Sequence, residues 1–312
     1  MLSKIMNCPS VAGRTEKMAA LLKDELSSLF DTTTTDPLGS LYFTKKTGEG
    51  KKLLVSCAID TPGLIATFTE GTKINVSAIG GFDIPNMAFS RVAFENAQGV
   101  LVPSGSFDHN APITDYVVET ANEEDVKKVV LGDVGCFDTQ ATILKDGTVF
   151  GFGAALKACV YTVALFAKQL MAEDAKLLKE EGITEVCFAF VSQENLANRG
   201  SSCVSFAANP DLVINVAPID MTEKNVGSLT FDDGFAVKML DKSFVADEEA
   251  TCLAERLLDK LGYKHKRRVS NTSRSAASRL GLCEKGAKLC EICLAAKFLT
   301  TGGECVKIPL CR

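Results

Sequence analysis

The stretch LLVSCAIDTPG occupies residues 53–63 and gives the first indication of the fold. Residues 53–59 are continuously apolar, which predicts a strand buried on both faces, as in a parallel sheet covered by helices. Upstream, residues 41–44 favour another strand. Residues 15–30 carry apolar side chains at helical spacing, so they predict an amphipathic helix capped by Thr15. The N-terminal region therefore indicates an α/β domain.

Helices and strands alternate again after residue 150. Long helical patterns separate short apolar runs such as VCFAFV and LVINV, which are typical of buried strands. The expected elements are a helix at 154–172, strands at 186–191 and 212–216, a helix at 247–261 and a strand at 288–294. Such alternation indicates an α/β fold in which helices pack on a largely parallel sheet.

The region between these two halves has a different texture. Short β-prone runs such as KINVSAI and GVLVPSG are separated by Gly, Asn, Asp and Pro, which indicates a small β-rich domain. Within it, residues 122–128 predict a short helix capped by Asn122. We therefore expect an α/β domain built from residues 1–65 and 150–312, interrupted by an inserted β domain at residues 66–149.

Composition narrows the class of protein. The 312 residues carry a net charge of −5, and an acidic chain is repelled by phosphates, so we expect no nucleic-acid partner. No apolar run approaches 18 residues and no signal-peptide pattern opens the chain, so we expect no membrane span and a cytoplasmic location. The twelve cysteines are then expected to be reduced and mostly buried.

The order of several short motifs resembles that of the glutamyl and deblocking aminopeptidases. The opening NCPSVAGRTEKMAALLKDEL is similar to that family's Gly/Ser turn and first helix. Three further motifs follow in the same order: DPLGS at residues 36–40, GGFD at 80–83 and VLGDV at 130–134. The resemblance extends over residues 2–308, and it rests on colinear order rather than on one decisive motif.

The resemblance implies a fold and a chemistry. The fold would be a three-layer α/β/α domain of the zinc-exopeptidase type with an inserted PDZ-like or barrel-like β domain. The family uses two zinc or cobalt ions, which activate water and polarise the scissile carbonyl. Its members assemble up to tetrahedral dodecamers, so the resemblance implies a homo-oligomer.

Five metal-ligand positions implied by the resemblance carry other residues. The two histidine ligands correspond to Ala58 and Thr300, and the bridging aspartate corresponds to Lys157. A glutamate ligand corresponds to Asn195 and an aspartate ligand to Asn215. These side chains form too weak a donor set for zinc, and a lysine repels a divalent cation. We therefore expect no metal cofactor.

Two acidic residues of the family pattern remain. The general base corresponds to Glu194, and the aspartate that orients the first histidine corresponds to Asp60. Buried carboxylates without a counter-charge are costly, so we expect the Lys157 ammonium to pair with Asp60 or Glu194 in place of the metals. The alternative is that Lys157 extends outward to solvent.

These residues leave several functions open. The first expectation is a degenerate aminopeptidase homologue that acts as an assembly, binding or regulatory subunit, as a homo-oligomer or beside an active paralogue. The second is a metal-dependent aminopeptidase with an atypical site. The third is a metal-free module that binds a peptide or amino acid in the old pocket.

Other signals are weaker. The cysteines could form a zinc knuckle, but residues three apart on a strand face opposite sides, so we favour core packing; the group is Cys283, Cys290, Cys293 and Cys305. The basic run at residues 264–268 is interpreted as a solvated loop or an anion site. A serine or cysteine hydrolase would need His109 or His265, the only two histidines.

Overall fold

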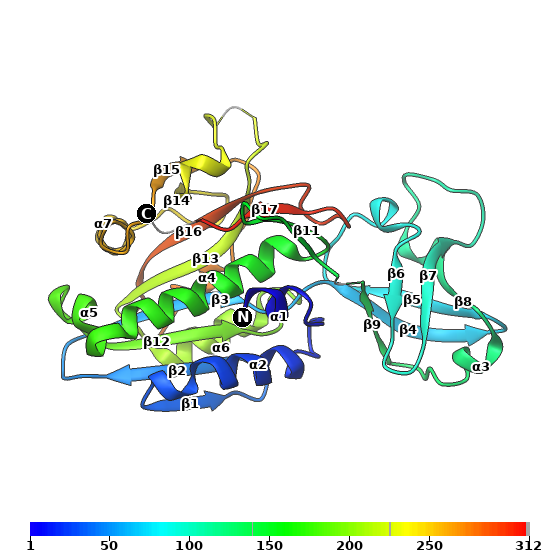
Figure 1. Ribbon diagram of the computed structural model, residues 1–312, viewed down its shortest axis with the longest axis horizontal. Coiled ribbons are helices and arrows are strands. Elements are labelled where there is room, and N and C mark those ends of the chain that lie inside the picture. Colours follow the sequence, from blue (N-terminus) through cyan, green and yellow to red (C-terminus); the bar gives the residue numbers. More distant parts are fainter. Residues whose placement is uncertain (139, 225, 310–312) are drawn as a thin grey trace.

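The computed structural model describes residues 1–138, 140–224 and 226–309. The molecule is elongated, with an α/β domain at one end and a β-barrel at the other (Figure 1). An eleven-stranded sheet forms the α/β domain, in the order β1-β2-β12-β3-β13-β16-β17-β11-β10, with β14 also paired to β16 and β15 paired to β14. Its strands are β1 (Thr32–Thr35), β2 (Leu41–Lys46), β3 (Lys51–Ala58), β10 (Thr142–Ile143), β11 (Thr148–Phe150), β12 (Ile183–Val191), β13 (Leu212–Asp220), β14 (Phe235–Leu240), β15 (His265–Val269), β16 (Lys288–Lys297) and β17 (Cys305–Lys307).

The centre of this sheet is parallel, as the apolar runs predicted. Strands β12, β3, β13 and β16 run side by side in the same direction, with Val55 of β3 opposite Phe188 of β12 and Ile214 of β13. All three residues are buried, because helices cover both faces of the sheet.

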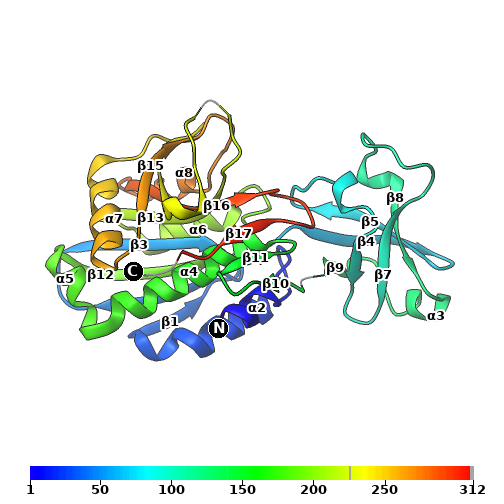
Figure 2. The same ribbon diagram turned by 45° about the horizontal axis from the view of Figure 1, so that its top comes forward.

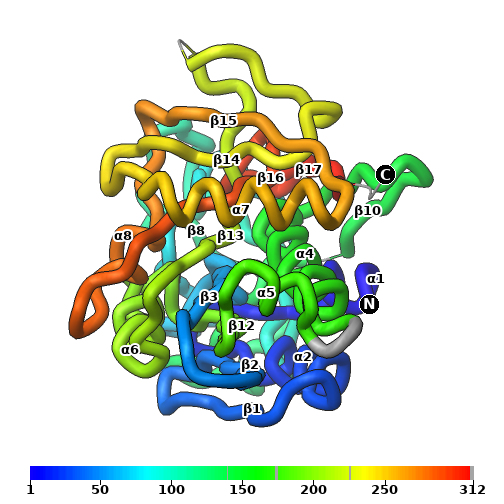
Figure 3. The backbone as a smooth tube through the Cα atoms, turned by 90° about the vertical axis from the view of Figure 1, so that its left-hand side faces the viewer, coloured from blue at the N-terminus to red at the C-terminus, as the bar shows by residue number. Residues whose placement is uncertain are grey.

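Helices cover both faces of the sheet. The resulting three layers confirm the expected α/β/α architecture. Figure 3 looks at the molecule from its α/β end and shows α6 and α8 on one side of β3 and β13, with α4 on the other. Side chains alternate accordingly: Leu53 and Val55 belong to the core under α4, whereas Leu54 packs toward α6 and α8. The helices are α1 (Leu2–Met6), α2 (Glu16–Leu26), α4 (Ala154–Met171), α5 (Lys176–Glu180), α6 (Arg199–Ala208), α7 (Glu248–Lys260) and α8 (Ala277–Leu280).

The inserted part is a closed barrel with its own apolar core. Its strands follow the order β4-β5-β8-β7-β6-β9, and Figure 2 shows them set apart from the large sheet. They are β4 (Gly63–Glu70), β5 (Lys73–Ile79), β6 (Arg91–Ala93), β7 (Gln98–Pro103), β8 (Tyr116–Thr120) and β9 (Val134–Phe137). Residues 142–149, which the sequence assigned to the insertion, contain β10 and the first two residues of β11, both strands of the large sheet.

Of the two helix caps predicted from the sequence, one is confirmed and the other is wrong. Asn122 caps the short α3 (Glu123–Val126) by accepting the Asp125 amide. Thr15 stands at the start of α2 but does not cap it, because its hydroxyl lies 3.1 Å from the Ser192 hydroxyl. Helix α4 is the one helix of the described residues that is long and apolar enough for a membrane span, and 72% of it is buried inside the protein.

Candidate functional site

A pocket of about 240 Å³ opens where the central strands end. Its wall includes Ala58 at the end of β3 and Val191 at the end of β12, together with Ala217 and Pro218 of β13. Residues 273–276, just before α8, form another part of the wall. The carboxyl ends of parallel strands are where α/β sheets bind ligands, because the loops there diverge and leave a crevice.

A row of polar side chains crosses the sheet below this pocket. Ser56, Asn215, Glu291 and Lys238 are register neighbours on the adjacent strands β3, β13, β16 and β14. Ser56 donates to Asn215 Oδ1 at 3.0 Å, and Asn215 Nδ2 donates to Glu291 Oε2 at 2.7 Å. The Ser275 hydroxyl also donates to Glu291 Oε2. The row is therefore one continuous hydrogen-bonded network in the interior.

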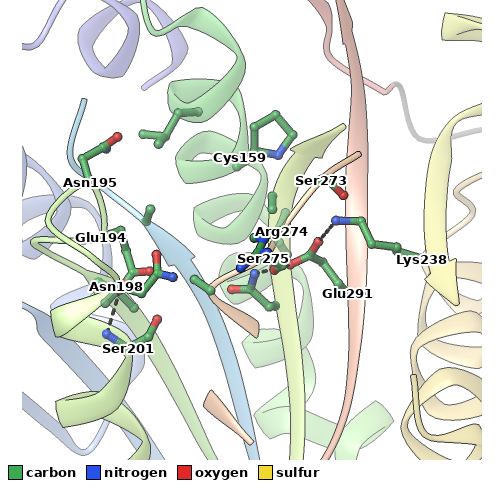
Figure 4. A pocket seen from close by; sticks show the side chains of 18 residues that line it. Cys159, Glu194, Asn195, Asn198, Ser201, Lys238, Ser273, Arg274, Ser275 and Glu291 are labelled. Atoms are coloured by element: carbon green, nitrogen blue, oxygen red, sulfur yellow. Dashed lines mark hydrogen bonds and ion pairs between the residues drawn. The ribbon is translucent and has the colours of Figure 1, made fainter. Parts of the chain in front are cut away.

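Lys238 provides the cation of this row. Its side chain is only 2% exposed, and its Nζ contacts Glu291 Oε1 and lies 3.4 Å from Asp241 Oδ2. Burial alone would favour the neutral amine, but the neighbouring Cys293, Glu291 and Asp241 raise the pKa of Lys238 above its usual value. The lysine is therefore a fixed positive charge beside the pocket. Figure 4 shows it reaching Glu291 at one side of the pocket wall.

A strained turn holds Glu194 at another part of the wall. Gln193, Ala197 and Asn198 have φ values of 61°, 60° and 56°, a left-handed conformation that costs energy for residues other than glycine. The turn closes tightly on α6, because a Cβ on Gly200 would lie 1.9 Å from the Ser192 carbonyl oxygen. Such strain persists where the surrounding structure fixes it, and it is common at functional sites.

Asp60 fixes this turn from below. It is fully buried and accepts the backbone amides of Glu194 and Asn195, each at 2.9 Å. The Asn195 side-chain amide also donates to Asp60 Oδ2, at 3.2 Å. Burial raises the pKa of Asp60, and these hydrogen bonds partly oppose the increase. Asp60 thus positions the backbone and does not face the pocket.

Glu194 is a buried carboxyl with one uncommitted oxygen. Oε1 accepts the Ser201 amide at 2.7 Å, whereas Oε2 has no hydrogen-bond partner among the described residues. Burial raises the pKa of Glu194 to about 7; hydrogen bonds from Ser201 oppose the shift and the Asp60 charge adds to it. The group can therefore exchange a proton near neutral pH, which suits a base or an acid.

The pocket brings together four of the seven predicted site residues. Ala58, Glu194, Asn195 and Asn215 line it. Thr300 does not; it is exposed in a turn, where its backbone amide donates to Glu304 Oε1 at 3.0 Å.

Lys157 also lies outside the pocket lining, and its expected pairing with Asp60 or Glu194 is wrong. Its ammonium donates to the Met6 carbonyl oxygen at 3.0 Å and forms no ion pair within the described residues. The alternative, that Lys157 extends to solvent, is also wrong, because the side chain is fully buried. Leu156 and Cys159 of α4 face the pocket instead, and a rotation of about 100° per residue turns Lys157 toward α1.

Ionisable side chains lie near Lys157, but among the described residues none forms an ion pair with it. Burial lowers the pKa of Lys157 to about 8, and the nearby Cys136, Cys8 and Glu304 oppose the shift. Glu304 accepts the Ala155 amide at the start of α4 at 3.0 Å. Burial also raises the pKa of Glu304 to about 7, against its two backbone hydrogen bonds and the Lys157 charge.

Sequence reasoning missed the charged residues of the pocket. Lys238 and Glu291 stand alone in the apolar runs AVKML and LCEICL, and an isolated charge in a buried strand is a signal that needs a partner. Arg274 and Ser273 carried no comparable signal. The basic run was interpreted as a loop, but it forms β15, and Arg268 there is only 3% exposed.

The weaker alternatives find no support in the described residues. Cys290 and Cys293 pack on opposite faces of β16, as a strand requires, and no group of three or more His, Cys, Asp or Glu side chains could hold a metal ion there. His109 makes an edge-to-face contact with Phe107, and His265 lies 3.1 Å from Asp259. Neither histidine lines the pocket.

Comparisons with known proteins agree on one family. The model of the M42 glutamyl aminopeptidase family matches residues 39–308. A curated protein of Acetivibrio thermocellus, provisionally described as an aminopeptidase, is 26% identical over 265 residues, which cover 82% of this chain and 77% of the relative.

Solved structures share the fold. An aminopeptidase from the archaeon Desulfurococcus kamchatkensis superposes with a TM-score of 0.86 at 16% identity, covering 98% of this chain and 89% of the other. The TET1 peptidase of Pyrococcus horikoshii gives a TM-score of 0.82 at 18% identity, covering 98% and 93%. At these low identities the comparison shows a shared fold, namely an α/β domain with an inserted barrel.

Proposed function

Because the chain belongs to the M42 glutamyl aminopeptidase family, we propose that it keeps the family's fold but no longer hydrolyses peptides with a pair of metal ions. In this proposal the protein is an assembly, binding or regulatory subunit. One observation carries the proposal: in the pocket, the positions that the family resemblance assigns to metal ligands hold a methyl group and two neutral amides, beside a buried lysine–glutamate pair.

The side chains of this pocket do not fit a two-zinc centre. Such a centre needs a bridging carboxylate and terminal His or carboxylate ligands. Ala58 offers no donor atom, the Asn195 amide donates to Asp60, and both side-chain heteroatoms of Asn215 are engaged by Ser56 and Glu291. The Glu291 carboxylate is neutralised by Lys238. A metal ion would have to displace the Lys238 ammonium from Glu291 before that carboxylate could coordinate it.

The proposed assembly role rests on relatives and on the surface of the barrel. The Pyrococcus horikoshii TET1 peptidase is described as assembling into a tetrahedron or a large octahedral shell. The barrel of this chain exposes large apolar side chains, including Phe68 at 59%, Phe89 at 64% and Leu131 at 79%. Exposed apolar surface of this kind is typical of protein interfaces. We therefore infer a homo-oligomer, or a hetero-oligomer with an active paralogue.

Metal content and hydrolysis test the proposal directly. The purified full chain is incubated with zinc or cobalt, desalted and assayed by elemental analysis and with a panel of aminoacyl-p-nitroanilides. We expect far less than one ion per chain and no metal-dependent release of nitroaniline, and light scattering should report an oligomer. Two ions per chain together with turnover that a chelator abolishes would overturn the proposal.

A second candidate function is a metal-dependent aminopeptidase with an atypical site. One observation favours it: Glu194, which corresponds to the family's general base, lines the pocket with a free carboxyl oxygen and a pKa of about 7. The same assay separates the two functions, because this candidate requires turnover that Glu194→Gln abolishes. Chelator-sensitive turnover lost in that variant would establish the second candidate.

A further inference from the structure

One buried arginine of the α/β domain has no carboxylate partner among the described residues. Arg268 of β15 is only 3% exposed, and its Nη1 donates to the carbonyl oxygens of Val226, at 2.9 Å, and Gly227. Its Nε and Nη2 atoms are buried and make no hydrogen bond within the described chain. An arginine stays charged in a folded protein, and buried charges are nearly always paired. The unmatched guanidinium therefore points to an anion that the described chain does not supply.

The neighbouring arginine shows what the free edge of Arg268 can bind. Arg267, on the same strand, donates from Nε and Nη2 to the two carboxylate oxygens of Glu255, at 2.8 and 2.9 Å. These parallel N–H groups match two oxygens of a carboxylate, phosphate or sulfate. Arg268 leaves the same two nitrogen atoms free, and its Nη1 contacts hold the guanidinium in place. The free edge is therefore a preformed fork for an oxyanion.

The carboxylates on this side of the sheet are committed to other donors. Lys238, the register neighbour of the buried arginine on β14, engages Glu291 and Asp241. Glu223 accepts one hydroxyl and two backbone amides from residues 270–272. None of these three carboxylates forms an ion pair with the buried arginine in the part of the chain that the structure describes. Its charge is therefore left for an external partner.

A loop between β13 and β14 covers the guanidinium. This covering loop (residues 221–224 and 226–230) projects at the top of the α/β domain in Figure 1. Side chains tie it to β15: Arg268 Nη1 holds two of its carbonyl oxygens, and Lys266 Nζ donates to a third, that of Ser228, at 2.8 Å. The covering loop can therefore open without breaking a strand pair of the sheet. Because the free nitrogen atoms lie under it, the site suits a small free ion rather than a phosphorylated macromolecule.

We propose that Arg268 and the covering loop form a binding site for a small inorganic oxyanion of the phosphate or sulfate class. One oxygen of the anion lies on Nε and another on Nη2, and the covering loop closes over it. Arg268 does not line the pocket at the carboxyl ends of the central strands, so this site is separate from that pocket. The assignment goes beyond the proposed function and does not depend on it.

Calorimetric titration of the full chain at pH 7 tests the assignment. Sodium phosphate and sodium sulfate are titrated separately, at an ionic strength kept constant with sodium chloride, because salt screens non-specific binding to surface charges. We expect saturable binding of one ion per chain. The third probe, O-phosphoserine, carries the same phosphoryl group on a larger body. It should bind about tenfold more weakly or worse, because a charge-assisted contact that the covered site cannot form is lost.

Variants of two adjacent arginines locate the anion. Arg268→Met should abolish binding, and Arg268→Lys should weaken it about tenfold, because an ammonium lacks the parallel pair of N–H groups. Arg267→Met is the matched control: it removes the same charge from the same strand, but from an arginine that already has Glu255 as its partner. This control should bind phosphate like the unchanged protein.

Hydrogen–deuterium exchange supplies a measurement that needs no variant. In the unchanged protein, phosphate should slow the exchange of amides in the covering loop and leave those of the barrel unaffected. No saturable binding of either ion at millimolar concentration would overturn the assignment. Equal binding by Arg268→Met would also overturn it, because Arg268 would then serve only to clamp the covering loop. These outcomes are independent of metal content and of peptide hydrolysis, which test the proposed function.

Discussion

Lys238 and Lys157 are both buried in the α/β domain, Lys238 on a strand of the sheet and Lys157 on helix α4. The Lys238 ammonium contacts Glu291, and its pKa is raised; Lys157 donates to a backbone carbonyl oxygen, and its pKa is lowered to about 8. Burial is similar, so the difference comes from the neighbouring carboxylate. A buried lysine is held firmly in its charged form where the fold places a carboxylate against it.

The largest expected effect comes from removing that partner. Glu291→Leu leaves the Lys238 ammonium with Asp241 alone, and breaking a buried ion pair from one side costs about 3–5 kcal/mol. The free energy of unfolding, measured by urea denaturation at pH 7, should fall by that amount.

Replacing both members of the pair tests whether the unpaired charge causes this loss of stability. In Lys238→Met/Glu291→Leu the pair itself is gone, and among the described residues Asp241 keeps only its hydrogen bonds from Ser243 and Phe244. Part of the loss should therefore be recovered, since apolar side chains of similar volume often replace a buried ion pair without cost. Lys238→Met alone completes the double-mutant cycle. A double variant as unstable as Glu291→Leu would show that the network matters for its geometry rather than for its charge balance.

Lys157 should behave in the opposite way. Lys157→Met removes an ammonium that burial disfavours, and a pKa lowered from 10.5 to about 8 corresponds to roughly 3 kcal/mol as an upper bound. Loss of the hydrogen bond to the Met6 carbonyl oxygen reduces this gain by about 1 kcal/mol. We therefore expect the variant to be more stable by about 2 kcal/mol at pH 7, measured by urea denaturation.

The stability gain of Lys157→Met should depend on pH. Between pH 8 and 10.5 the unfolded chain keeps the proton that folded Lys157 has released, so the stability of the unchanged protein rises in this window. The advantage of Lys157→Met should be constant below pH 8 and should shrink toward pH 10.5. An advantage that is independent of pH would mean that improved packing, and not charge, causes it.

The contrast between the two lysines also explains what the sequence could predict. Continuous apolar runs such as 53–57 and the alternation after residue 150 determine buried strands and covering helices, because burial acts on each segment locally. The segment RGSSCVSFAA, which forms α6, opens with Arg, Gly and two Ser, and it was not predicted as a helix. Strands β14 and β15 were missed because charged residues interrupt them.

The site depends on features that a single segment does not contain. Ala58, Glu194, Asn195 and Asn215 line one pocket. Ala58 ends β3, Glu194 and Asn195 follow β12, and Asn215 lies within β13. The pair of Lys238 and Glu291 is set by the antiparallel register of β14 and β16, which brings together residues 53 positions apart. Lys157 was misplaced because helix rotation, not chain order, decides which side chains of α4 face the pocket.

The smallest effect is expected at a third lysine on the same helix as Lys157. Lys168 Nζ lies 2.7 Å from Glu25 of α2, and the two side chains are 36% and 23% exposed. Solvent screens such a pair, so Lys168→Met should lower the free energy of unfolding by about 0.2–1 kcal/mol, and less at high salt. Urea denaturation at pH 7 in 0.05 and 0.5 M sodium chloride measures the difference. A loss comparable to that of Glu291→Leu would mean that burial does not separate these pairs, and the contrast between Lys238 and Lys157 would then need another cause.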